Sequence, residues 1–121
     1  MEALEEFLIF GNAQILPEFI SFIFKDSSEH YRDHAFRILN DIKDTEAIPV
    51  LAEALHQYRG KKDYSYLVSS CWQNGMDFSP YIQQFMDIMI KDELNVAIEA
   101  FSVIEENFHH LENTEKQDIL N

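Results

Sequence analysis

Two histidines four residues apart, His30 and His34, are the first residues whose type and spacing suit chemistry. On a helix they would share one face, and both could reach the same metal ion. The stretch His30-Tyr31-Arg32-Asp33-His34 does not match H-E-x-x-H and offers no third ligand at a recognised spacing. We therefore expect two exposed histidines here, and whether they bind a metal stays open.

Cys71 is the single cysteine, so the chain has no internal disulfide framework. A nucleophilic thiol needs a neighbouring base with an orienting carboxylate. Ser69 and Ser70 precede Cys71, and no such base is evident in the sequence. Since the repeats described below place Leu39 and Phe101 at the same position, we expect a buried and inert thiol.

Adjacent carboxylates occur as Asp92-Glu93 and Glu105-Glu106. Neighbouring residues on a helix point in different directions, so these pairs are poor partners for acid–base catalysis. The chain also has no glycine-rich phosphate loop. The sequence therefore predicts a protein that is not an enzyme and that carries no cofactor. The adjacent pair His109-His110 predicts the end of a helix, where a partial positive charge is favourable.

The chain has 121 residues, enough for one domain, and a formal net charge of −13. Residues 63–121 hold 11 acids and two bases, Lys91 and Lys116. This field disfavours nucleic acid and anionic membranes and indicates a basic partner. The alternative is that acidity serves solubility alone. The one basic cluster, Arg59-Gly60-Lys61-Lys62, is expected to be a solvated turn.

The N-terminus is acidic and no apolar run is long enough to cross a bilayer. With one cysteine and no signal-like segment, we expect a cytoplasmic protein.

The elements that must position these residues are helices in pairs. Ala35, Leu39 and Ile42 lie at spacing 0, 4, 7, on one face of a helix. A polar turn follows, and Pro49 then opens a second helix, because proline is tolerated in the first turn. The two helices form one helix–turn–helix unit.

The same pattern recurs along the chain. The apolar face reappears at Ala3-Phe7-Phe10, Leu67-Cys71-Asn74 and Ala97-Phe101-Ile104, in steps of 32, 32 and 30 residues. Prolines recur at Pro17, Pro49 and Pro80, in steps of 32 and 31. The residues two and six after each proline are apolar: Phe19 and Ile23, Leu51 and Leu55, Ile82 and Met86. Such a period predicts stacked repeats.

The expected helices span 2–10, 15–25, 28–42, 46–58, 63–74, 79–91, 93–108 and 113–120. Ser27 or Ser28 would cap the third helix, and Thr114 or Asn113 the last. Gly11 and Gly75 mark helix ends, where glycine turns left-handed without a Cβ clash. The repeat units would be about 1–26, 27–59, 63–91 and 93–121, in a single domain.

The pattern of Ala35, Leu39 and Ile42 followed by Asp44 and 47–51 resembles the HEAT-repeat signature. More narrowly, it resembles the short HEAT-like repeats known from phycobilin lyases. The resemblance covers roughly residues 1–108, and it departs at Leu67, at Asn74 and in the fourth unit, which lacks the proline. It implies an all-α fold, a right-handed α–α solenoid of about three and a half two-helix repeats. It does not imply lyase activity, because it includes no catalytic residue.

In this family the second helices usually line the concave side, which implies a binding strip one, four and eight residues after each proline. Those positions are Glu18, Ser21, Lys25, Val50, Glu53, Gln57, Tyr81, Gln84 and Ile88. Five aromatic residues could either anchor a binding surface or fill gaps between stacked helices: Trp72, Tyr58, Tyr64, Tyr66 and Tyr81. Tyr64 and Tyr66 cannot both face the core.

The prediction is therefore a non-enzymatic protein-binding module for a basic protein or peptide, and more specifically an immunity-type inhibitor of a toxin. Two alternatives stay open. One is a lyase-like accessory protein for a cofactor or small ligand, which needs a closed pocket. The other is a self-association module that forms a weak homodimer through the open ends of the stack.

Overall fold

The chain folds into helices alone in the part that the computed structural model describes, residues 13–25 and 29–108. The α-helices are α2 (Leu16–Lys25), α3 (Glu29–Asn40), α4 (Ala47–Gln57), α5 (Tyr64–Gln73), α6 (Ile82–Lys91) and α7 (Leu94–Asn107). Two short 3-10 helices, η1 (Ala13–Ile15) and η2 (Ser79–Tyr81), precede α2 and α6. These elements confirm the six helices predicted between residues 15 and 108, within two residues at nearly every end.

Several predictions fall outside the described residues. They are the helix at 2–10 with its apolar positions Ala3, Phe7 and Phe10, the helix at 113–120 with its cap at Thr114 or Asn113, the helix end at Gly11, the cap at Ser27 or Ser28, and the pair His109-His110. Within the described ranges, no helix combines the length and the apolar character that crossing a bilayer requires.

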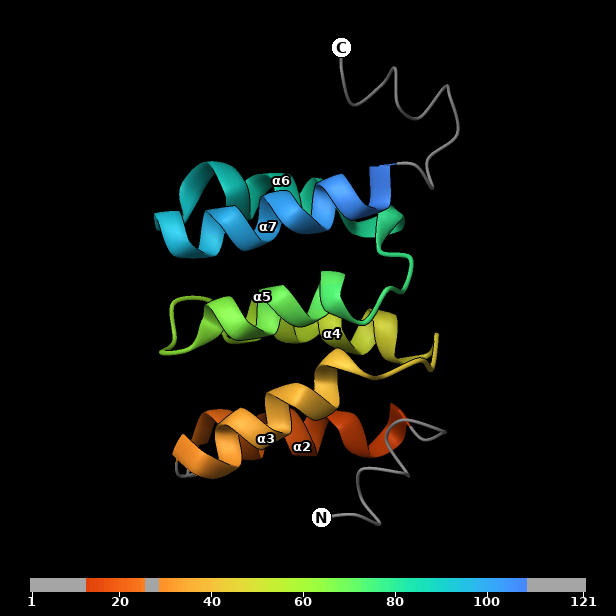
Figure 1. The fold of residues 1–121 in the computed structure, drawn as a ribbon, viewed down its shortest axis with the longest axis vertical. Helices are drawn as coiled ribbons and strands as arrows, with labels where there is room; N and C mark the ends of the chain where they lie inside the picture. Colours follow the sequence, from red (N-terminus) through yellow and green to blue (C-terminus); the bar gives the residue numbers. More distant parts are fainter. Residues whose placement is uncertain (1–12, 26–28, 109–121) are drawn as a thin grey trace.

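The helices lie in three layers along the long axis of the molecule: α2 with α3, α4 with α5, and α6 with α7 (Figure 1). Across the layers, α3 packs on α5, α5 packs on α7, and α2 packs on α4. Only Asp92 and Glu93 separate α6 from α7, and such short connections make consecutive helices antiparallel neighbours. Each layer therefore joins a helix that has a proline in its first turn or in the 3-10 turn before it to the helix that follows, whereas the predicted units joined such a helix to the preceding one.

The first helices bury the faces that the spacing predicts in α3 and α5. Ala35 and Leu39 of α3 are buried, as are Leu67 and Cys71 of α5, and Ile42 is buried in the turn that follows α3. These side chains belong to one core that extends from α2 to α7. The 0, 4, 7 pattern is therefore confirmed for the two central first helices.

Local signals set the helix ends. Pro17 and Pro49 lie in the first turns of α2 and α4, where a missing N–H costs no helical hydrogen bond. Gly75 follows α5 with φ +73°, a left-handed conformation that glycine adopts without strain. Asn74 is fully buried, and its Oδ1 accepts a hydrogen bond from the Met76 N–H at 3.0 Å. The apparent loss of an apolar residue at position 74 thus serves the turn that ends α5.

Hydrogen bonds between helices join residues about one repeat period apart. The pairs are Arg32–Asp63 (31 residues apart), Asn40–Ser70 (30), Ala52–Gln84 (32), Phe78–Asn107 (29) and Arg59–Asp92 (33). Each bond connects one layer, or its loop, to the next. These polar contacts, 29 to 33 residues apart, therefore lie close to the 30-to-32-residue spacing of the apolar faces.

The buried face of α6 differs from the predicted one. The sequence pattern predicts Ile82 and Met86 inside and Ile88 outside, but Ile82, Phe85 and Ile88 are buried and Met86 is half-buried. Pro80 lies in η2, and a 3-10 helix turns about 120° per residue instead of about 100°. Counted from Pro80, the two steps to Ile82 rotate the following helix by roughly 40° relative to α2 and α4, so this spacing no longer identifies the faces of α6.

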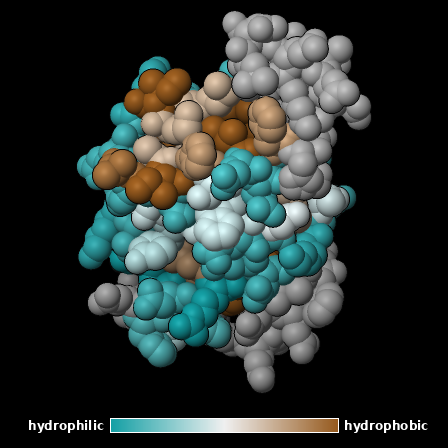
Figure 2. All heavy atoms as spheres, turned by 45° about the horizontal axis from the view of Figure 1, so that its top comes forward, coloured by the Kyte–Doolittle hydropathy of each residue, from teal (hydrophilic) through white to brown (hydrophobic). Residues whose placement is uncertain are grey.

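The predicted inner face of α7 is also wrong. Val96, Ala100 and Val103 are buried, whereas Phe101 is 52% exposed and Ala97 and Ile104 are half-buried. α7 contacts both α5 and α6, so its orientation is set by two neighbours. The helix has apolar residues on two sides, and the side without Phe101 is the one that packs inward. Hydrophobic surface consequently gathers over the α6–α7 layer (Figure 2).

Candidate functional site

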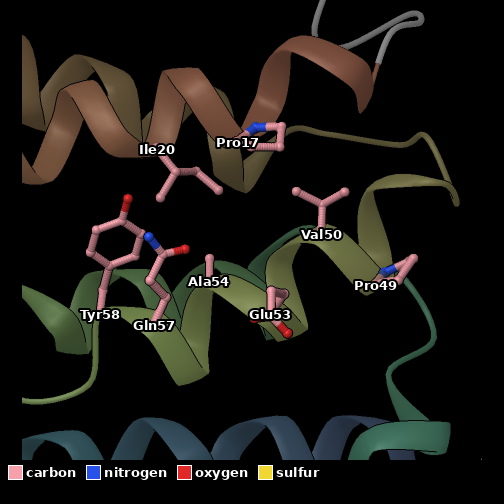
Figure 3. Close-up of a pocket in the computed structure, with 8 residues that line it drawn as sticks. All are labelled: Pro17, Ile20, Pro49, Val50, Glu53, Ala54, Gln57 and Tyr58. Atoms are coloured by element: carbon pink, nitrogen blue, oxygen red, sulfur yellow. The ribbon is translucent and has the colours of Figure 1, made fainter.

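The described surface contains an apolar cleft between α2 and α4, with a volume of about 280 Å³ (Figure 3). Its lining consists of Pro17, Ile20, Pro49, Val50, Glu53, Ala54, Gln57 and Tyr58. Pro17 and Ile20 point from α2 toward α4, where Val50 and Ala54 lie opposite them. The cleft therefore lies between equivalent helices of successive layers, on the side of the molecule where the prolines recur.

Small and rigid residues keep this cleft open. Ala54 carries only a methyl group where a larger side chain would fill the gap between the helices. At one end the Tyr58 ring stacks on Phe24, with ring centroids 4.6 Å apart and an angle of 14° between the planes. Stacked aromatic rings hold each other in place. The Tyr58 ring is thus held against Phe24 at one end of the cleft.

The rim of the cleft is polar and acidic. Glu53 is exposed and makes no ion pair with another described residue, and Gln57 is exposed beside it. Glu18 is exposed on the same turn of α2 as Pro17. An apolar floor with a carboxylate at its edge suits an aliphatic or aromatic side chain next to a cationic one.

A second cleft, of about 370 Å³, lies between α4 and α6. It is lined by Pro49, Ala52, Glu53, His56, Tyr81 and Gln84. Glu53 and Pro49 border both clefts, so the two form one strip across the three layers. The Gln84 Nε2–H donates to the Ala52 carbonyl oxygen at 2.8 Å, which ties α6 to α4 at the floor of the strip.

Most of the predicted strip residues meet here. Val50, Glu53 and Gln57 line the first cleft, and Tyr81 and Gln84 line the second. Glu18 and Lys25 are exposed and Ser21 half-buried on α2, outside both clefts. The prediction that Ile88 belongs to the binding strip is wrong, because only 1% of its surface is exposed. The 3-10 turn of η2 rotates Ile88 into the core, so it cannot contact a partner.

The predicted strip omitted Pro17, Ile20, Pro49 and Ala54, and Tyr58 was left open as either a surface anchor or a gap filler. The repeat of prolines at 17 and 49 was visible in the sequence and could have suggested that both prolines lie on one surface. The role of Ala54 in leaving space between α2 and α4 can be recognised only when the distance between these helices is known.

The basic turn predicted to be solvated contains an ion-pair cluster. Arg59 donates from Nε to Asp92 Oδ1 and from Nη1 to Asp87 Oδ2, each at 2.9 Å. Both carboxylates raise the pKa of Arg59, Asp92 more than Asp87. Hydrogen bonds from Arg59 and Lys91 lower the pKa of Asp87. Arg59 therefore links the α4–α5 loop to the end of α6, while Gly60, Lys61 and Lys62 are exposed as expected.

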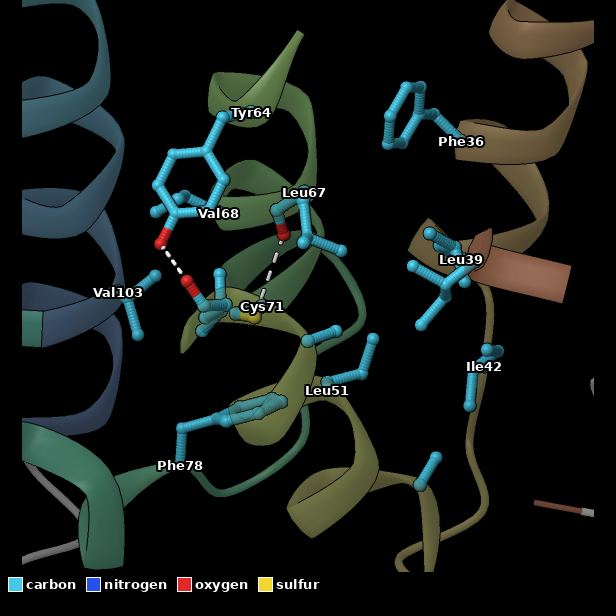
Figure 4. Close-up of a cluster of buried hydrophobic side chains, with 14 of the residues drawn as sticks. Phe36, Leu39, Ile42, Leu51, Tyr64, Leu67, Val68, Cys71, Phe78 and Val103 are labelled. Carbon is cyan, nitrogen blue, oxygen red and sulfur yellow. Dashed lines mark hydrogen bonds between the residues drawn. The ribbon is translucent and has the colours of Figure 1, made fainter. Parts of the chain in front are cut away.

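Tyr64 and Cys71 lie in the core, where the structure gives each a structural role (Figure 4). The Tyr64 hydroxyl donates to the Leu55 carbonyl oxygen, and the Cys71 thiol lies 3.6 Å from the Leu67 carbonyl oxygen. Burial raises the pKa of both groups well above their ordinary values. Tyr66, two residues from Tyr64, is 53% exposed, as the argument that both cannot face inward requires.

We expect Cys71 to resist modification in the native protein. At pH 8 the reaction with a disulfide reagent such as Ellman's reagent should be at least about 100-fold slower than in the same protein unfolded in guanidinium chloride, because the buried thiol is both inaccessible and protonated. Since Cys71 is the only cysteine, the absorbance change reports on it alone. Stoichiometric labelling of the folded protein within seconds would contradict the inert-thiol interpretation.

His30 is exposed and His34 half-buried on α3. Among the described residues, no three side chains of His, Cys, Asp or Glu come together in a way that could hold a metal ion. The structure therefore adds no ligand to the histidine pair.

Comparison with known proteins adds no relative from which a role could be read: no protein-family model, no curated protein and no solved structure matches the chain.

Proposed function

We propose that the chain is a non-enzymatic protein-binding module, a right-handed α–α solenoid of short HEAT-like repeats that holds its partner on the strip between α2, α4 and α6. The observation that carries the proposal is the pair of adjoining clefts that share Glu53 and Pro49. Stacked layers and hydrogen bonds about one repeat period apart support the repeat architecture.

The size and chemistry of the strip favour a peptide segment over a small molecule. Sites for drug-sized ligands enclose roughly 300–1,000 Å³ and surround most of the ligand. The α2–α4 cleft, at about 280 Å³, lies below this range and the α4–α6 cleft, at about 370 Å³, lies at its lower end, so each suits one or two side chains. Its polar groups, Glu53 and Gln57, are exposed at the rim and do not converge inside. This is why the accessory role for a cofactor or small ligand is the second candidate.

Charge indicates the chemistry of the partner. The chain carries a formal charge of −13, and the carboxylate of Glu53 at the centre of the strip has no described cationic partner. A segment with an apolar anchor flanked by Lys or Arg would fill the cleft and pair with Glu53, and the overall field would speed its association. An immunity-type inhibitor of a basic toxin in the cytoplasm is the specific form of this proposal.

Selection from a random 12-residue peptide display library tests the proposal directly. We expect the selected peptides to share an aromatic or aliphatic residue flanked by Lys or Arg. For the best peptide, Val50→Lys should weaken binding at least about tenfold, because it places a long cationic chain in the cleft. Glu53→Lys should weaken binding and reduce its dependence on salt.

Glu46→Lys is the matched control. It makes the same charge change as Glu53→Lys on an exposed residue at the start of α4, outside both clefts, and should alter affinity less than about twofold. Equal losses in Glu53→Lys and Glu46→Lys would reduce the effect to net charge and overturn the cleft. Peptides without basic residues would overturn the partner chemistry, and stabilisation of the fold by cofactor-like small molecules in a thermal shift screen would favour the accessory role.

A further inference from the structure

We propose that the outward face of α7 is a second docking surface, which takes a basic amphipathic helix of a partner protein. The surface, here the α7 stripe, consists of Leu94, Ala97, Ile98, Phe101 and Ile104. It lies on the end layer of the stack, away from the clefts between α2, α4 and α6. The inference is independent of the proposed function of those clefts.

The α7 stripe has the geometry of a helix-packing face. Its members follow the spacing i, i+3, i+4, i+7, i+10, which aligns them along one side of the helix over about 15 Å. Leu94 is 76% exposed, Ile98 53% and Phe101 52%, and Ile90 at the end of α6 adds a further side chain that is 73% exposed. Figure 2 shows this hydrophobic surface over the α6–α7 layer. Scattered exposed apolar residues need no explanation, but a contiguous group marks an interaction site.

The charges beside the α7 stripe determine what can cover it. α7 and its N-cap carry four carboxylates, at Glu93, Glu99, Glu105 and Glu106, and no basic residue. Glu99 accepts a hydrogen bond from Trp72 Nε1 at 3.0 Å, and the other three are exposed. Near the start of α7, Arg59, Lys61 and Lys91 line a cleft with Glu93, where Arg59 pairs with Asp87 and Asp92 and Lys91 pairs with Asp87. Toward the C-terminal end of the α7 stripe, Glu105 and Glu106 are exposed and make no ion pair with a described base, so negative charge borders that end.

These negative charges disfavour two possible occupants of the α7 stripe, a second copy of the chain and the chain's own residues 109–121. A second copy of the chain would bring the same carboxylates against these, and like charges across an interface cost several kcal/mol. Residues 109–121 hold three acids, Glu112, Glu115 and Asp118, against Lys116. A helix of another protein with an apolar face and Lys or Arg on its flanks complements both the stripe and its border.

Stacking explains why the occupant is a helix. Helices α3, α5 and α7 form one row, in which α5 packs on α3 and α7 packs on α5. Among the described residues no helix continues this row beyond α7. A docked helix would pack its ridges into the grooves of α7 and bury the stripe in the way α7 buries the face of α5.

The test titrates the full-length chain with an 18-residue peptide of leucine and lysine whose leucines follow a 3-4 spacing, and with a scrambled peptide of the same composition. We expect the patterned peptide to bind more tightly and to gain helicity by circular dichroism. The double variant Ile98→Gln, Phe101→Gln should weaken this binding at least about tenfold. Phe22→Gln, an equally exposed aromatic on α2 outside both clefts, should leave it unchanged.

Each other outcome counts against the proposal. Equal affinity for the scrambled peptide would mean attraction by net charge alone. A loss in Val50→Gln without a loss in the α7 double variant would move the peptide to the cleft. A wild-type dimer in analytical ultracentrifugation that the double variant abolishes would assign the stripe to a second copy. A large loss of stability in a monomeric double variant would mean that the chain itself covers the stripe.

Discussion

Phe85→Ala will lower the free energy of unfolding by about 3–5 kcal/mol, whereas Met86→Ala next to it will cost no more than about 1–2 kcal/mol. Phe85 is fully buried and contacts Phe78 edge to face, with centroids 5.9 Å apart and an angle of 88°. Deleting its ring removes apolar burial, an aromatic pair and a packed volume that neighbouring side chains can refill only in part. Met86 is half-buried and leaves no closed cavity.

Urea denaturation followed by circular dichroism measures both variants against the wild-type chain. Two-state fits with similar m-values make the free energies comparable. The pair is informative because spacing from Pro80 predicts Met86 inside, while the structure places Phe85 there. If Met86→Ala cost as much as Phe85→Ala, the rotation of α6 after η2 would be wrong.

Asn107→Leu will destabilise the chain by about 1–3 kcal/mol although leucine has nearly the same shape. Asn107 is fully buried, its Oδ1 accepts from the Phe78 N–H at 2.8 Å, and its Nδ2 donates to the Val103 carbonyl oxygen at 2.8 Å. The substitution leaves a buried backbone N–H without its acceptor, and that desolvation penalty exceeds what leucine gains by burial.

Asn95→Leu is the matched control, since Asn95 is exposed on the same helix. It should change stability by no more than about 0.5 kcal/mol. Thermal or urea unfolding of the three proteins gives the comparison. A neutral or stabilising Asn107→Leu would mean that the contact between α7 and the Phe78 turn does not hold the end layer in place.

Local signals made the helices predictable. The prolines, the turn residues and the 0, 4, 7 faces act within a few residues, so the helices from α2 to α7 could be predicted nearly to the residue. The buried positions of α3 and α5 followed from the same periodicity. Asn74 looked like a defect in that pattern, and the structure gives it a polar role at the end of α5.

Rotation about the helix axis was not predictable in α6 and α7. Ile88 and Phe101 were assigned to the wrong sides because a 3-10 turn and a second neighbouring helix fix the rotation, and neither leaves a mark in the spacing. The clefts were partly predictable: Val50, Glu53 and Gln57 came from the proline spacing together with the concave side that the family resemblance implies. Ala54 could not be predicted, since its role depends on the separation between α2 and α4.

The hydrogen bonds one repeat period apart have a consequence for folding kinetics. Because these links join each layer only to its neighbour, the sequence separation between contacting residues stays short as the stack grows, and such low contact order goes with fast folding. It also limits cooperativity. Unfolding can start at one end and propagate, so native-state hydrogen exchange should show graded protection, highest in α4 and α5, which have a described layer on each side.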